Sequence, residues 1–143
     1  MRIVCGQTAP VQGSTASKPE AKRSLKFSVI VVGDTFEDGV QMGTTEFGAS
    51  DGVLLHMTYG QFPDPEHATA KFEKVLGTSI KIVKRGEKLD QSGKTVGERA
   101  QVLISGSKPN ETIPAVLWTD GRMFREISAT SLPDILELEK VYR

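Results

Sequence analysis

Residues 53–85 read VLLHMTYGQFPDPEHATAKFEKVLGTSIKIVKR and place one helix between two strands, Val53–Tyr59 and Ser79–Arg85. The helix is predicted to begin after Asp64, because a carboxylate there accepts bonds from free amides and Pro65 suits the first helical position. Gly77 suits the left-handed residue that often ends a helix. Only this connection in the chain suits two strands that run in the same direction, so the other connections are expected to be antiparallel.

Five further segments have the composition of strands, with turn residues between them: Leu25–Val32, Val40–Phe47, Gly97–Ser105, Ile113–Thr119 and Arg122–Ser128. A final helix is expected after Ser131, which suits a helix cap. The predicted order is three strands, a helix, four strands and a helix. We therefore expect a two-layer α+β domain, with a mostly antiparallel sheet of about five to seven strands and both helices on one face.

Asp120 and Gly121 are predicted to form the two central residues of a type I′ hairpin turn. This turn would place Trp118 opposite Met123. Side chains alternate along a strand, so Val116, Trp118, Met123 and Ile127 are expected to share one face of the sheet.

The chain is predicted to consist of a flexible leader, residues 1–24, and a single domain, residues 25–143. Gln7–Ser24 contains Pro10 and Pro19 and has no periodic apolar face, so it lacks the apolar surface that offsets the entropy of ordering. A leader of this kind is common behind a cleaved signal peptide, which favours an extracytoplasmic over a cytoplasmic origin.

Composition argues against several classes of protein. Eighteen Lys and Arg balance eighteen Asp and Glu, so the overall positive charge that attracts nucleic acid is missing and no nucleic-acid partner is expected. The longest apolar runs are far shorter than the roughly 18 residues of a spanning helix, so no transmembrane segment is expected. Cys5 is the single cysteine, which rules out an intramolecular disulfide and a zinc site built on paired cysteines.

No motif for cofactor or metal chemistry has the required spacing. The segment 86–95 ends in GKT, but six residues separate its glycines, where a phosphate loop has four and continues into a helix. The acidic residues between 34 and 51 lack the alternate spacing of a calcium loop. We expect no metal, no cofactor and no catalytic residue, and a protein that is more readily explained as a binding domain than as an enzyme.

The clearest functional signal is the order of charges along the chain. Residues 27–70 carry seven acidic side chains and no Lys or Arg, whereas residues 71–99 carry eight basic and four acidic side chains. The basic segment is predicted to form a partner-binding surface, with Lys81 and Arg85 on one side of their strand. Its candidate residues are Lys81, Lys84, Arg85 and Lys88.

Two hypotheses follow for function. The first is a non-catalytic protein-interaction or assembly domain, an accessory subunit that docks a partner protein or a second copy through charged faces or a sheet edge. The alternative is a small-molecule binding protein or minor hydrolytic enzyme, with a pocket near His56 that Tyr59 also lines.

A chain that begins at Ser24 is expected to melt within a few degrees of the full chain, because Gln7–Ser24 offers no apolar face to a folded domain. Thermal unfolding followed by circular dichroism gives the two midpoints. A large loss of thermal stability would show that these residues pack on the domain and that the predicted boundary is wrong.

Overall fold

The computed structural model describes residues 26–37 and 40–142, so the expected leader, residues 1–24, lies outside the described residues. The described elements follow the predicted order of three strands, a helix, four strands and a helix. The strands are β1 (Phe27–Glu37), β2 (Val40–Ala49), β3 (Leu54–Gln61), β4 (Lys81–Leu89), β5 (Thr95–Ser105), β6 (Thr112–Asp120) and β7 (Met123–Ser128). The helices are α2 (Pro65–Thr78) and α3 (Leu132–Tyr142).

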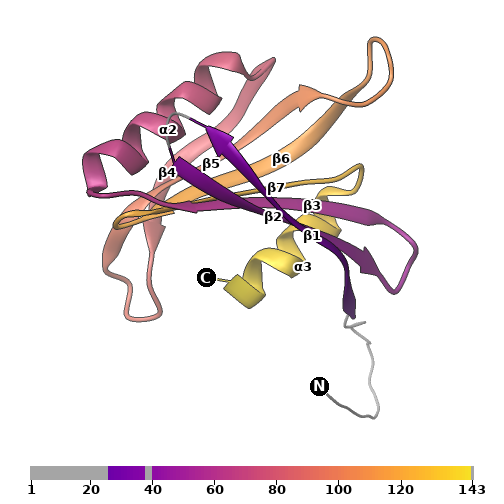
Figure 1. Cartoon of the computed structure of the whole chain (residues 1–143), viewed down its shortest axis with the longest axis horizontal. Helices are drawn as coiled ribbons and strands as arrows, with labels where there is room; N and C mark the ends of the chain where they lie inside the picture. The colour runs from indigo at the N-terminus through magenta and orange to yellow at the C-terminus, as the bar shows by residue number, and fades with distance from the viewer. Residues whose placement is uncertain (1–25, 38–39, 143) are drawn as a thin grey trace.

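All seven strands form one antiparallel sheet in the order β1-β2-β3-β7-β6-β5-β4, as Figure 1 shows. Helix α2 links β3, inside the sheet, to β4, at its far edge. Each neighbouring pair between β3 and β4 is antiparallel, so β3 and β4 run in the same direction, as predicted for this connection. Strands β1 and β4 form the two edges of the sheet.

Helix α2 begins as predicted but ends differently. The Asp64 side chain accepts a hydrogen bond from the His67 amide at 2.8 Å, and Pro65 is the first helical residue. The helix continues through Gly77 to Thr78 and is capped by Ser79, whose hydroxyl donates to the Leu76 carbonyl at 2.7 Å. A side-chain cap at Ser79 therefore replaces the predicted left-handed glycine.

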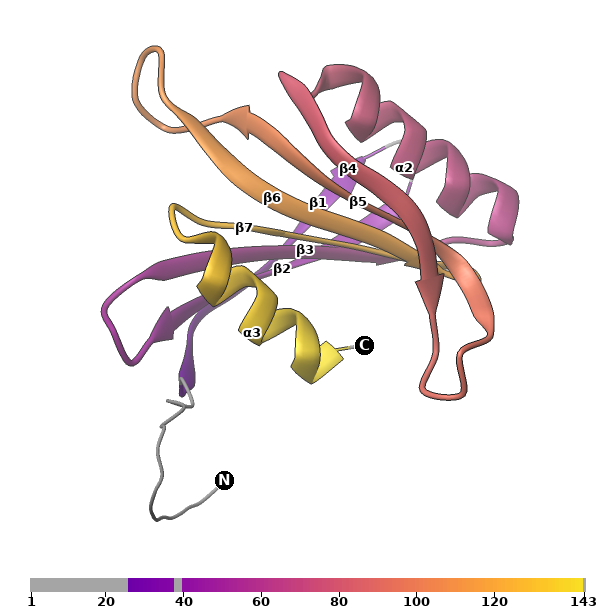
Figure 2. The same cartoon turned by 180° about the vertical axis from the view of Figure 1, so that it is seen from behind.

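The two helices lie on opposite faces of the sheet (Figures 1 and 2), and the prediction of both helices on one face is wrong. The reason lies in β6, which is buried on both sides. Ala115 and Leu117 belong to the core beneath α2, whereas Val116 and Trp118 belong to the core beneath α3. A strand with two apolar faces needs cover on both. The α+β class and the antiparallel sheet are as expected, and the layers are helix, sheet and helix.

Each helix closes its own core. The core under α2 is formed by Met42, Phe62, Ala68, Phe72, Leu76, Ala100, Val102, Ala115, Leu117 and Phe124. The core under α3 is formed by Phe47, Leu55, Met57, Val116, Trp118, Ile127, Ala129, Ile135 and Leu138. Both helices contact β6 and β7, so the packed part of the molecule is centred on these strands and the sheet edges extend beyond it.

The β6–β7 turn lies one residue later on the chain than predicted. Asp120 pairs with Met123 and Trp118 with Arg125, so the central residues of the turn are Gly121 and Arg122. Of these two, only Gly121 has a positive φ, 61°, which fits a type II′ turn rather than type I′. Trp118 lies opposite Arg125 rather than Met123. Because Arg125 and Met123 are two residues apart on the same strand, Trp118 and Met123 still share a face.

Replacement of Gly121 by Val is expected to lower the free energy of unfolding by about 1–2 kcal/mol, because a β-branched side chain resists the left-handed conformation. Gly86→Val is the matched control, since a Cβ atom at Gly86 would meet nothing within 4 Å and its φ is not positive. Denaturant titration measures both variants. Equal stability of the two would contradict the assigned turn.

Candidate functional site

The basic residues of β4 do not share one surface, because the strand contains a bulge between Ile82 and Lys84. Lys81 lies opposite Leu103 and Lys84 lies opposite Gln101, which are two residues apart on β5. These positions face away from α2. Arg85 lies opposite Ala100, a residue of the core under α2. The prediction that Lys81 and Arg85 lie on one side is therefore wrong, since the bulge adds one residue between them.

Arg85 is bound within the molecule, although its side chain is 41% exposed. Its Nη2 donates to Glu98 Oε1 at 2.7 Å and to Glu73 of α2. The guanidinium also lies 5.6 Å from the centre of the Phe72 ring. The bonds to Glu98 and Glu73 raise the pKa of Arg85. This residue thus fastens α2 to the edge strand.

Lys88 is buried, with 4% of its surface exposed. Its ammonium lies 5.6 Å from the centre of the Trp118 ring, within the range of a cation–π contact. Its cross-strand neighbour is Gly97. Because Gly97 has no side chain, the Lys88 side chain can lie close against the sheet. Of the four residues predicted to bind a partner, Lys81 and Lys84 are therefore the two that are exposed and face away from α2.

His56 and Tyr59 lie on opposite faces of β3, because they are three residues apart on a regular strand. His56 faces Glu46 of β2, with 3.7 Å between Nδ1 and Oε2 and with both side chains about half exposed. Tyr59 packs over Gly43 instead, where an added Cβ would lie 2.4 Å from the ring. The predicted pocket lined by both residues is therefore not formed.

Tyr59 belongs to a stack of side chains beside α3. The Arg125 guanidinium carbon lies 5.5 Å from the centre of the Tyr59 ring and 4.6 Å from that of Tyr142. Its Nε donates to the sulfur of Met123 at 3.2 Å. Burial lowers the pKa of Arg125 and raises that of Tyr142. The stack holds the end of α3 against the sheet.

A shallow hollow of about 370 Å³ lies between the β4–β5 hairpin and α3; Glu87, Lys88, Leu89, Arg99, Leu136, Glu139 and Lys140 line it. Arg99 donates from Nε and Nη2 to the two oxygens of Glu139, at 2.7 and 2.8 Å. The Glu139 side chain is 5% exposed, and its bond raises the pKa of Arg99. This forked pair satisfies both groups and fixes α3 to β5, so the hollow presents few free polar groups.

The two sheet edges differ in chemistry. Edge β4 carries four cations, of which Lys81, Lys84 and Arg85 are exposed, beside several exposed apolar side chains, and it has two register shifts. Edge β1 carries four exposed apolar side chains, Val29, Ile30, Val32 and Phe36, and has no charged residue between Lys26 and Asp34. An open edge can accept a further strand, and cations and bulges oppose this. β1 is thus the less protected edge.

Among residues 26–37 and 40–142, no group of three or more His, Cys, Asp or Glu is placed to hold a metal ion. No helix in the described part of the chain has the length and apolar character needed to cross a membrane. Comparison with known family models, curated proteins and solved structures finds no match.

Glu139→Gln is expected to lower the free energy of unfolding by about 2 kcal/mol, because it removes the charge that balances the half-buried Arg99. Glu137→Gln is the control on the same helix; it alters an exposed pair with Lys140 and is expected to cost no more than about 0.5 kcal/mol. Urea titration compares the two. Similar losses would mean that the Arg99–Glu139 pair does not anchor α3.

Proposed function

We propose that this protein is a non-catalytic interaction or assembly domain that docks a partner protein through edge strand β1. The observation that supports this proposal most is the row of exposed apolar side chains on that strand. Val32 is 70% and Phe36 is 76% exposed. Apolar side chains on an open edge expose both a hydrophobic surface and unpaired backbone groups, and a partner strand would cover both.

The difference between the two edges supports β1 as the docking edge. Natural sheets protect their edges with lysines, inward charges and bulges, which prevent indiscriminate pairing. Edge β4 has these features in Lys81, Lys84 and the bulge before Lys84. Edge β1 has one bulge, between Val29 and Val31, and an uncharged centre. An edge with less protection is expected in a protein whose partner covers it.

Charged faces receive less support than a sheet edge. The proposed basic surface reduces to Lys81 and Lys84, because Arg85 pairs with Glu98 and Glu73 and because Lys88 is buried. Exposed single charges contribute mainly to the rate of association and to specificity. We therefore assign these two lysines a secondary role.

The alternative function, small-molecule binding or hydrolysis near His56, has no geometric support among the described residues. His56 and Tyr59 face opposite sides of β3, and His56 lies on the surface beside Glu46. The hollow near Lys88 lies elsewhere, and the Arg99 and Glu139 side chains that line it bind each other.

The proposed function is tested by a single charge placed on each edge. Val32→Lys adds a cation to the centre of β1, and Ile82→Lys does the same on β4, where the replaced side chain is 46% exposed. Both substitutions are at the surface and are expected to change the free energy of unfolding by no more than about 0.5 kcal/mol. Tagged forms of the wild type and both variants are purified from the source organism, and the proteins retained by each are quantified.

A protein retained by the wild type and by Ile82→Lys, but lost with Val32→Lys, supports docking through β1. Untagged copies of the chain count among the retained proteins. Equal retention by all three forms, or no retention by the wild type, contradicts the proposal. Thermal unfolding of each variant confirms that it is folded.

A further inference from the structure

We infer that the partner of β1 is a second copy of this chain, bound so that the two β1 strands pair antiparallel about a two-fold axis and the two sheets become continuous. This inference rests on the proposed docking through β1 and names its occupant. A two-fold interface uses the same surface on both copies, so β1 must be complementary to itself. Three features favour this complementarity: the charges near the ends of β1, the shared face of its valines, and the net positive charge of the other edge, β4.

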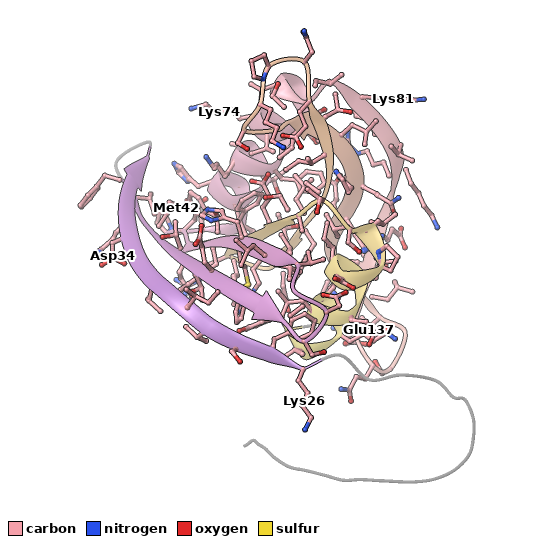
Figure 3. All side chains as sticks on the ribbon, turned by 90° about the vertical axis from the view of Figure 1, so that its right-hand side faces the viewer. Lys26, Asp34, Met42, Lys74, Lys81 and Glu137 are labelled. Atoms are coloured by element: carbon pink, nitrogen blue, oxygen red, sulfur yellow. The ribbon has the colours of Figure 1, made fainter. Side chains whose placement is uncertain are left out.

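The charges around β1 are complementary to those of an antiparallel copy. Lys26 lies just before the strand and Asp34 lies in its second half; Figure 3 shows Lys26 at the start of β1 and Asp34 further along it, both directed away from the core. The Ser50 amide donates to the Lys26 carbonyl at 2.8 Å, and this bond fixes where the Lys26 backbone lies. In the antiparallel register that sets Val29 opposite the partner's Val32, Lys26 lies opposite the partner's Thr35, and Asp34 lies opposite the partner's Phe27. Unlike charges are therefore one residue apart at each end, on opposite faces of the joined sheet, and they attract through the long-range field rather than as a contact pair. Parallel pairing would bring like charges together.

The bulge in β1 makes its apolar side chains match as well. Val29 lies opposite Phe47 and Val32 lies opposite Thr45 on β2. Phe47 and Thr45 are two residues apart and share a face, so Val29 and Val32 also share a face, although they are three residues apart. In the antiparallel register that sets Val29 of one copy opposite Val32 of the other, side chains on the same face meet along the strand. Two cross-strand valine pairs then replace four exposed valines.

Strand β4 lacks this complementarity. β4 carries four cations against one acidic residue, Glu87, so an antiparallel copy would bring together two edges of net positive charge, and like charges across a strand pair are unfavourable. Pairing of β1 with β4 of another copy would join unlike surfaces and build an open chain of molecules rather than a closed dimer. The register shifts of β4 also oppose the regular pairing that such a chain needs. The isologous β1 pair is the arrangement that these features favour.

Sedimentation velocity of the full-length protein tests the inference, under reducing conditions so that no Cys5 disulfide contributes. The wild type and Ile82→Lys are expected to sediment as dimers at micromolar concentrations, and Val32→Lys is expected to sediment as a monomer. A wild type that is monomeric at 200 µM, chosen as roughly the upper limit for a weak specific contact, would overturn the inference. Equal weakening by Val32→Lys and Ile82→Lys would also overturn it.

A charge-exchange series tests the antiparallel orientation. Lys26→Glu and Asp34→Lys each place like charges one residue apart at both ends of the dimer, and each is expected to weaken dimerisation about threefold at low salt. The double variant restores opposite charges and is expected to recover wild-type affinity. Failure of the double variant to recover, while it remains folded by thermal unfolding, would overturn the antiparallel arrangement.

The outcomes separate this inference from the proposed function. The wild type can be monomeric while a protein other than this chain is retained by the wild type and lost with Val32→Lys. In that case the second copy is rejected and docking through β1 stands. Hydrogen exchange identifies another occupant: a monomer whose Phe27–Gly33 amides are protected on the outer side would show that the chain covers β1 itself. That result would overturn both proposals. Concentration-dependent growth beyond a dimer would instead indicate the β1–β4 arrangement and reject the two-fold pair.

Discussion

The double-sided burial of β6 is the constraint on which the rest of the structure depends. Four consecutive residues, Ala115–Trp118, are almost completely buried and alternate between two cores. A strand in this position needs a neighbour on each side and a helix on each face. The neighbours of β6 are β5, which precedes it in the chain, and β7, which follows it. Helices α2 and α3 cover its two faces. The outer strands then extend the sheet beyond the region that the helices cover.

Ion pairs join the peripheral elements to this centre. Arg85 connects β4 with α2, and Arg99 connects β5 with α3. The Arg99–Glu139 pair is largely buried, and removing one partner of a buried pair is costly. The Arg85 pairs are exposed and contribute less. These pairs therefore fix which part of each helix lies against the sheet, while the two apolar cores provide most of the stabilisation. The basic residues of the chain serve this internal purpose more than the charge order of the sequence indicates.

The order and type of the elements were predictable because each has a local cause. Asp64 and Pro65 mark a helix start, and Gly121 marks a hairpin. The arrangement of the layers was predicted wrongly, although the continuous apolar run in β6 was a usable signal for a strand covered on both faces. The bulge at Val83 has no comparable local signal, and it reversed the side on which Arg85 lies relative to Lys81. The Arg99–Glu139 pair joins residues forty positions apart, so it depends on how α3 packs rather than on any neighbouring sequence.

The sheet is assembled from two meanders that meet at one seam. Strands β1–β3 and strands β4–β7 each pair with sequence neighbours, whereas the β3–β7 seam pairs Met57 with Ile127, seventy residues further along the chain. Closing so long a loop carries the largest entropic cost of any strand pair in the sheet. During synthesis, the β1–β3 meander emerges from the ribosome long before β7 exists to receive it. The outermost β1 strand is therefore exposed throughout the interval in which the nascent chain is most vulnerable to pairing with the wrong neighbour.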